Sequence, residues 1–105
     1  DTHAHIYSPD EKRYPPNAKP LRVPDGKGSL EDLRSVSRAN GVERACLIQV
    51  STFYRFDNSY ICDSALQSKD WTAGVCTLDP DDAHSPDLLK HYARKYGIKG
   101  MRSIP

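Results

Sequence analysis

The sequence predicts an α/β fold built around a parallel β-sheet. Apolar runs of strand length alternate with segments that have helical spacing and helix caps, in the order β-loop-α-β-α-β-α-β. The run over residues 45–50 is almost continuously apolar, as strands buried in a parallel sheet are. Such alternation implies right-handed crossovers between parallel strands. A length of 105 residues corresponds to at most one domain.

A strand is predicted over residues 1–7, and a proline-rich loop over residues 8–28 follows it. The loop holds five of the eight prolines and shows neither a helical nor a strand period. A loop of this length in a compact domain is usually functional or disordered, and its composition favours neither. Ser29 then offers a helix N-cap, with Asp32 three residues later in an approximate capping box. This helix is expected to stop at Gly41.

The remaining elements continue the alternation. Asp57 or Asn58 can cap a second helix, and Ser85-Pro86-Asp87 opens a third, which Gly97 ends. Strands are predicted over residues 45–50, 71–78 and 98–104. Apolar residues at helical spacing predict the buried helix faces: Leu30, Leu33 and Val36; Ile61, Ala65 and Leu66; Leu88, Leu89, Tyr92 and Tyr96.

Two architectures fit this order of elements. One is a doubly wound open sheet, and the other is the first half of an eight-stranded barrel; neither period nor length separates them. A doubly wound sheet would usually carry a glycine-rich turn after its first strand. Here histidines and prolines occupy that position. Because the sequence starts and stops within predicted strands, we expect the whole chain, residues 1–105, to be a fragment of a longer protein.

Composition argues against several classes of partner. Fifteen Lys and Arg balance fourteen Asp and Glu, which disfavours nucleic acid and anionic membranes. No apolar stretch approaches the length of a membrane span. The three cysteines, Cys46, Cys62 and Cys76, are widely spaced and odd in number, so we expect free buried thiols and a cytoplasmic protein.

The sharpest chemical feature is His3-Ala4-His5. Residues two apart in a strand project to the same face, so both imidazoles and the Asp1 side chain should point the same way. They lie near the carboxyl end of the first predicted strand, where parallel α/β folds place ligands. Two imidazoles there can hold a divalent metal or an anionic oxygen. The alternative is a pair of strand-end histidines bonded to backbone groups.

Other candidate ligands follow the later strands or lie in the loop. Ser51 and Tyr54 come directly after the second strand, where hydroxyls can bond a carboxylate, although they also suit an ordinary turn. Arg102 can clamp a carboxylate at the end of the fourth strand, or pair with Asp79. Tyr14 can fold over a substrate or pack on the edge of the fold. His84 and His91 are expected to be surface residues.

The opening segment Asp1-Thr2-His3-Ala4-His5-Ile6 resembles the first strand of the amidohydrolase superfamily. Further segments resemble its amidohydrolase-related branch, and within it the 2-pyrone-4,6-dicarboxylate lactonase-like hydrolases. In chain order these segments are Arg13-Tyr14-Pro15, Ser29-Leu30-Glu31-Asp32-Leu33, Ala39-Asn40-Gly41-Val42-Glu43-Arg44-Ala45, Asp57-Asn58-Ser59 and Gly97-Ile98-Lys99-Gly100-Met101-Arg102.

The resemblance implies a (β/α)8 TIM barrel, of which this chain holds strands one to four in parallel order. His3 and His5 match residues that bind metal or polarise the scissile carbonyl. Arg102 matches an arginine that grips a substrate carboxylate, and Ser51 and Tyr54 match a stretch that contributes hydroxyl contacts. The resemblance leaves two modes open with equal weight: one divalent metal such as zinc, or catalysis without a metal.

The leading functional hypothesis is hydrolysis of a carboxylate-bearing lactone or related cyclic ester by the parent protein. The resemblance places the later-strand histidines and the aspartate that activates water outside this chain, so the fragment alone should be inactive. The alternatives are a metal-dependent decarboxylase of the same superfamily and an inactive truncated half-barrel. The expected partners are a small carboxylate substrate and the missing half of the barrel, with no nucleic acid or membrane; homo-oligomerisation is left open.

Overall fold

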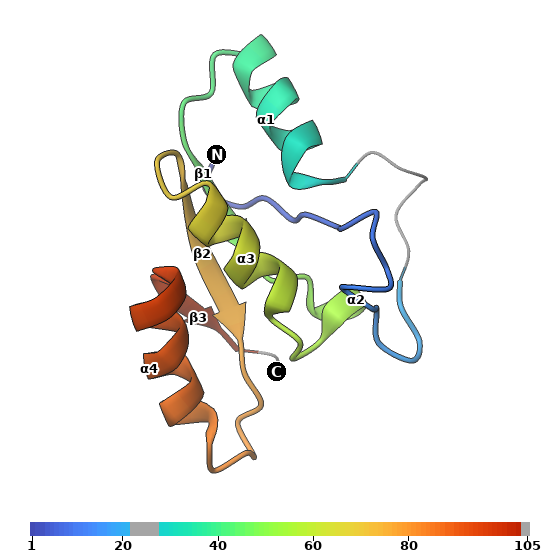
Figure 1. Ribbon diagram of the computed structural model, residues 1–105, viewed down its shortest axis with the longest axis vertical. Coiled ribbons are helices and arrows are strands. Elements are labelled where there is room, and N and C mark those ends of the chain that lie inside the picture. Colours follow the sequence, from blue (N-terminus) through green and yellow to red (C-terminus); the bar gives the residue numbers. More distant parts are fainter. Residues whose placement is uncertain (22–27, 104–105) are drawn as a thin grey trace.

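The sheet has three parallel strands in the computed structural model, which describes residues 1–21 and 28–103. β1 (Ala45–Ile48) pairs with β2 (Thr72–Thr77), and β2 pairs with β3 (Gly100–Arg102) (Figure 1). Leu47 lies beside Gly74 in this register. The predicted α/β class and the parallel direction of the strands are therefore confirmed.

The predicted first strand is a bridged segment and not a regular strand. Ala4 forms one isolated parallel bridge with Leu47. The Ala4 amide donates to the Cys46 carbonyl at 2.9 Å, and the Ile48 amide donates to the Ala4 carbonyl at 2.8 Å. The expectation of four regular strands is therefore wrong for the described residues. The segment makes a single bridge pair, Ala4 with Leu47, and a regular strand needs consecutive pairs such as the three that join β3 to β2.

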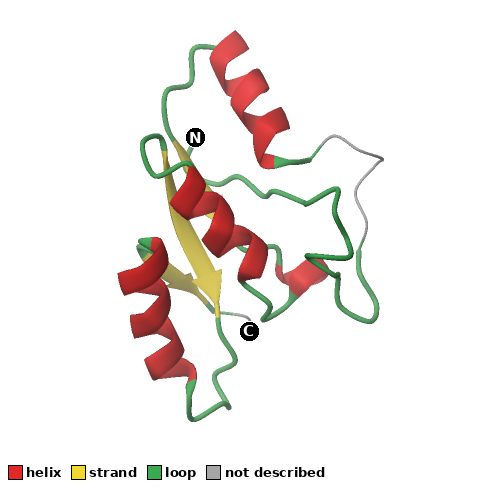
Figure 2. Cartoon of the chain, viewed as in Figure 1, coloured by secondary structure: helices red, strands yellow, loops and turns green. Residues whose placement is uncertain are grey.

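Two helices cover one face of the sheet. α3 (Ser59–Gln67) and α4 (Ser85–Tyr96) lie side by side in front of the strands (Figure 2). α1 (Leu30–Ala39) lies near the amino ends of the strands. A short helix, α2 (Ser51–Tyr54), follows β1 where the sequence predicted only a turn. Four residues are too few to show a helical period.

The helix signals in the sequence are largely confirmed. The Ser29 hydroxyl accepts from the Asp32 amide and the Asp32 carboxylate accepts from the Ser29 amide, both at 3.2 Å, so the capping box is complete. Gly97 ends α4 with φ of +68°, a left-handed conformation that glycine adopts without steric cost. Ser85 begins α4 as its first residue and donates to the Asp79 carbonyl at 2.6 Å, whereas the sequence predicted it as the cap.

The core lies between the sheet and its helices. Leu47, Cys76 and Ile61 are fully buried there. Gly74 is needed at the closest approach, because a Cβ at this position would lie 2.7 Å from Ile98 Cδ1 and 2.9 Å from Ala65 Cβ. The backbone of β2 can therefore approach α3 only where the chain has no side chain.

Two residues predicted to be buried are exposed instead. Val36 is 60% exposed and Leu66 is 43% exposed. The buried residues of α1 are Leu30 and Ser37, which lie on one side of the helix, and Val36 lies about 120° around the helix from Leu30, so it faces away from the core. Periodicity marks an apolar stripe, but it does not show how much of the stripe a neighbour covers.

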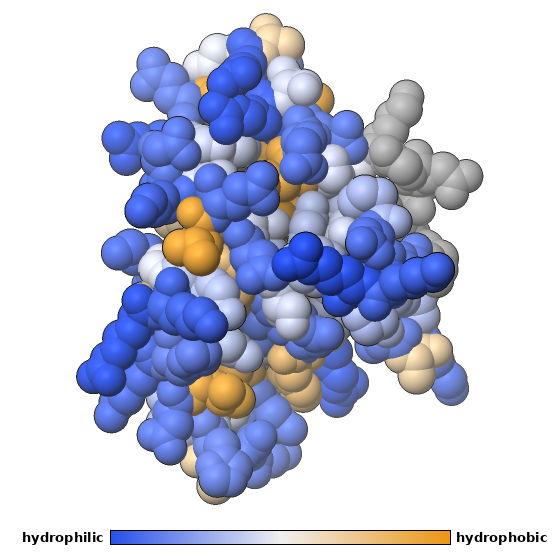
Figure 3. All heavy atoms as spheres, viewed as in Figure 1, coloured by the Kyte–Doolittle hydropathy of each residue, from blue (hydrophilic) through white to orange (hydrophobic). Residues whose placement is uncertain are grey.

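The helix-covered face is largely polar, with separate apolar patches (Figure 3). Within the described residues, no helix is long and apolar enough to cross a membrane. All three cysteines are free, as expected; Cys62 and Cys76 are buried and Cys46 is half-buried. Two predictions lie partly outside the described residues: the proline-rich loop at Pro24 and the fourth strand at Ile104.

Candidate active site

The histidine pair points away from the helices. Ala4 is the bridge partner of Leu47, which points into the helix-covered core. Side chains alternate between the faces of an extended chain, so His3 and His5 project to the opposite, open face. Burial agrees with this assignment, because Ala4 and Ile6 are buried while both histidines are exposed. The prediction that both imidazoles share one face therefore agrees with the geometry.

The two imidazoles touch at their Nε2 atoms. These atoms are 3.2 Å apart, and the rings are perpendicular with centroids 4.8 Å apart. The other ring nitrogen of His5, Nδ1, lies 2.9 Å from the Ile48 carbonyl. A carbonyl oxygen can only accept, so Nδ1 must donate. In a neutral His5 the lone pair is then on Nε2, which accepts a hydrogen bond from His3 Nε2–H.

This geometry fits two ligands of a divalent metal. Two nitrogens each about 2.05 Å from a tetrahedral zinc ion lie about 3.3 Å apart, close to the observed Nε2 separation. The hydrogen bond from His5 Nδ1 to Ile48 is the kind of contact that orients a metal-bound imidazole. Across residues 1–21 and 28–103, no group of three His, Cys, Asp or Glu side chains could share a metal. These residues can therefore supply two ligands of a metal site, with the others coming from elsewhere.

Arg102 lies on the same open face. Ile48, Val75 and Gly100 are paired across the three strands. Ile48 follows Leu47, which points into the helix-covered core, so this set of paired residues points to the open face. Arg102 is two residues after Gly100 in β3, so it shares the open face and lies nearer the carboxyl end. Its side chain is exposed and forms no ion pair with Asp79 in the described structure.

Across the sheet, the segment that carries His5, β1, β2 and β3 follow one another in that order. In a flat sheet, the backbones of the His5 segment and of β3, which carries Arg102, would therefore be three strand spacings, about 14 Å, apart.

Tyr54 is a core residue. Its ring is buried, and its hydroxyl accepts a hydrogen bond from the Ser8 amide at 2.8 Å. Burial raises the pKa of Tyr54 to about 12. The structure therefore does not bring Tyr54 to the histidine pair, although the sequence places it directly after a strand.

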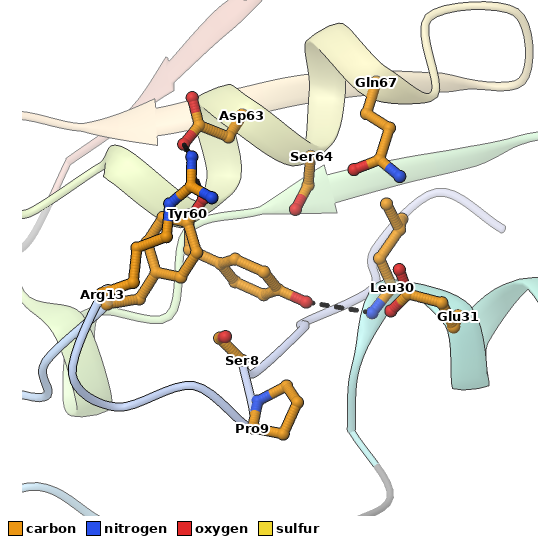
Figure 4. A pocket seen from close by; sticks show the side chains of 10 residues that line it. Ser8, Pro9, Arg13, Leu30, Glu31, Tyr60, Asp63, Ser64 and Gln67 are labelled. Atoms are coloured by element: carbon orange, nitrogen blue, oxygen red, sulfur yellow. Dashed lines mark hydrogen bonds and ion pairs between the residues drawn. The ribbon is translucent and has the colours of Figure 1, made fainter.

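Tyr14 lies in the helical layer, in a hollow of about 250 Å³ between the N-terminal loop, α1 and α3 (Figure 4). Its hydroxyl donates to Asp63 Oδ2 at 2.6 Å, and its ring packs against Tyr60. Burial, and then the Asp63 hydrogen bond, raise the pKa of Tyr14 to about 12. The structure separates Tyr14 from the histidines by the thickness of the sheet, because α3 covers the opposite face.

Ser51 lies beyond the carboxyl end of β1, as predicted. It lines a hollow of about 600 Å³ between α2 and the loop residues 17–21. Lys19, Thr52 and Arg55 line the same hollow. This hollow lies at the edge of the sheet where the sequence predicts a ligand to bind.

Two buried amide side chains, Gln49 and Asn58, hold the backbone at this edge, in roles that the sequence pattern did not predict. Gln49 Nε2 donates to the carbonyls of Arg55 at 3.1 Å and Asp57 at 2.7 Å. Asn58 occupies the predicted cap position of α3, but its side chain bonds both backbone groups of Thr77 at 2.8 and 2.9 Å. The Asn58 amide thus extends the hydrogen bonding of β2 after β1 has ended. The polar Gln49 within an apolar run was the available signal.

The fold is shared with solved structures of larger proteins. A structure from Acinetobacter baumannii matches with a TM-score of 0.76 and 20% identity, over 97% of this chain and 36% of that one. One from Agrobacterium tumefaciens matches with a TM-score of 0.71 and 21% identity, over 97% and 35%. One from Pseudomonas putida matches with a TM-score of 0.71 and 26% identity, again over 97% and 35%.

The names of two of these structures agree with the resemblance seen in the sequence. The Acinetobacter and Pseudomonas proteins are provisionally named 2-pyrone-4,6-dicarboxylic acid hydrolases, and the former contains citric acid. No protein-family model matches the chain, and no curated protein is significantly similar to it. The chain spans about a third of the length of the solved structures that it matches. In fold, this chain therefore resembles the 2-pyrone-4,6-dicarboxylic acid hydrolase-like proteins.

Proposed function

We propose that this chain is part of a (β/α)8 barrel hydrolase that opens a carboxylate-bearing lactone. The observation that carries the proposal is the contact between His3 and His5 on the open face of the sheet, with Arg102 on the same face. The parallel strands, the cover of one face by α3 and α4, and the match to about a third of larger hydrolase-like structures support the barrel.

In the proposed reaction, water adds to the lactone carbonyl and the ring C–O bond breaks, giving a carboxylate and a free hydroxyl. The His3–His5 pair stabilises the negative charge that develops on the carbonyl oxygen, by donating hydrogen bonds when it carries an extra proton. A divalent metal, when bound, would supply Lewis-acid polarisation at the same point. Arg102 holds a substrate carboxylate through its two parallel N–H groups. A carboxylate outside this chain acts as the general base that takes the proton from water.

The test replaces His3 and His5 by Asn in the complete protein, with 2-pyrone-4,6-dicarboxylate as substrate. We expect kcat/KM to fall by about 100- to 1,000-fold for each variant, the range for losing one group that stabilises a transition-state charge. His91→Asn, an exposed histidine on α4, is the matched control and should retain wild-type activity. Unchanged hydrolysis in both pair variants would remove the histidines from the mechanism.

A decarboxylase is the second candidate, because the Nε2 separation of 3.2 Å suits a metal. Elemental analysis of the complete protein, combined with an assay for CO₂ release from unsaturated acids, separates the two reactions. A stoichiometric metal with CO₂ release would favour the decarboxylase. We also propose that the 105-residue chain alone is inactive, because the carboxylate base of the proposed reaction lies outside it; turnover by the isolated chain would contradict this.

A further inference from the structure

Arg55 occupies a backbone position that favours glycine. The Asp57 amide donates to the Tyr54 carbonyl at 3.0 Å, which closes a β-turn with Arg55 as its first central residue. Arg55 has φ of +52° and ψ of −112°, close to the values of a type II′ turn, where glycine dominates. It is the single non-glycine residue with positive φ within the described ranges. A side chain at this position strains the backbone.

The rest of the structure holds this strained turn in place. The buried Gln49 side chain donates to the Arg55 and Asp57 carbonyls, so it fixes the turn from the core. The Arg55 amide donates to the Ser51 carbonyl at 3.1 Å. Strained residues that persist because their surroundings determine them tend to occur at functional sites.

Arg55 lines the hollow of about 600 Å³ beside α2. Lys19 lines it as well, from the loop that runs along α2 (Figure 1). Two backbone hydrogen bonds fix that loop, from the Asn17 amide to the Phe53 carbonyl at 2.8 Å and from the Leu21 amide to the Thr52 carbonyl at 3.0 Å. The second cation is therefore positioned by the fold as well.

The hollow has the charge of an anion site. Among the described residues, no Asp or Glu lines it and neither Lys19 nor Arg55 forms an ion pair; the Arg55 guanidinium lies 5.1 Å from the centre of the Phe56 ring. Arg13, in the hollow under Tyr14, instead lies 3.9 Å from Asp63. Ser51 and Thr52, which carry hydroxyl groups, also line the hollow. Two unpaired cations with hydroxyl donors suit a carboxylate.

We propose that Arg55 and Lys19 bind a second carboxylate of the substrate and so select polycarboxylates over monocarboxylates. This inference rests on the proposed function, in which Arg102 binds the first carboxylate. β1, which precedes the hollow, and β3, which carries Arg102, lie two strand spacings, about 10 Å, apart. A carboxylate-binding role for the guanidinium would account for an arginine at a glycine-type position.

The test measures citrate binding to the complete protein by titration calorimetry, together with the melting temperature. Arg55→Gln and Lys19→Gln should each weaken citrate binding by about tenfold, the usual effect of losing a charged hydrogen bond. Arg55→Gly should weaken binding equally and raise Tm by about 2–4 °C, because it relieves the turn. Arg34→Gln, a cation on α1 that lies over the Trp71 ring, is the matched control and should leave citrate binding unchanged.

Citrate affinity that stays at the wild-type level in the Arg55 variants would overturn the proposal, as would a wild-type protein that does not bind citrate. A lower Tm for Arg55→Gly would overturn the argument from strain. Loss of the proposed lactone hydrolysis with retained, Arg55-dependent citrate binding would instead count against the reaction and leave the carboxylate site standing.

Discussion

The two faces of the sheet treat polar groups differently. On the helix-covered side, the Tyr14 and Tyr54 hydroxyls are bonded within the chain, to Asp63 and Ser8. On the open side, His3 and His5 bond each other, His5 also bonds the Ile48 carbonyl, and Arg102 is exposed. Adjacent residues of one segment point to opposite faces, as Ala4 and His5 do. The contrast indicates that stability and chemistry are separated by side-chain alternation along the strands.

The largest expected effect is a loss of stability on the helix-covered face. Leu47→Ala should lower the free energy of unfolding by about 3 kcal/mol, since Leu47 is fully buried and its loss leaves a cavity. Leu66→Ala on α3, the same change at an exposed site, should alter stability by less than about 0.5 kcal/mol. Urea unfolding of the complete protein measures both, and equal losses would contradict the burial of Leu47 between the sheet and its helices.

A somewhat smaller effect is expected at the carboxyl edge, where the two faces meet. Gln49→Leu leaves the Arg55 and Asp57 carbonyls without their donor, and it should reduce stability by about 2 kcal/mol. Gln67→Leu, an exposed glutamine on α3, is the control and should be nearly neutral. The same unfolding experiment decides the matter, and a neutral Gln49→Leu would show that the amide does not hold the loop.

The Tyr54→Phe variant distinguishes a structural role of the Tyr54 hydroxyl from a role in substrate binding. The structure predicts a stability loss of about 1 kcal/mol, from the bond to the Ser8 amide, with KM unchanged. The sequence-based assignment of Tyr54 to substrate binding predicts the reverse, a raised KM at full stability. Steady-state kinetics and thermal unfolding of the one variant therefore discriminate between the two, and Tyr14→Phe provides the same comparison for Asp63.

The last comparison is the dependence of stability on alkaline pH. The folded pKa values of Tyr14 and Tyr54 are about 12, above the ordinary value of 10. The unfolded chain therefore releases these protons first, so the stabilisation is complete below pH 10 and is lost as the pH rises toward 12. The Tyr14→Phe/Tyr54→Phe double variant should lose less stability between pH 10 and 12 than the wild type does. An identical loss in both proteins would exclude the two tyrosines as its source.

The sequence by itself determined the local features of this protein. The capping box at Ser29, the helix end at Gly97 and the apolar run of β1 are encoded within a few residues. Alternation along an extended chain also determined that His3 and His5 share a face. These predictions hold because caps, turns and periods depend on near neighbours in the chain.

Only the tertiary structure decided which groups meet across the chain. The partners of Tyr54 and Tyr14 lie 46 and 49 residues away, so nothing near either tyrosine indicated that its hydroxyl was occupied. The strain at Arg55 depends on a turn that Gln49 fixes from the end of β1. Local patterns state which way a side chain points, whereas packing decides whether its polar atoms are satisfied inside the protein or remain available for a ligand.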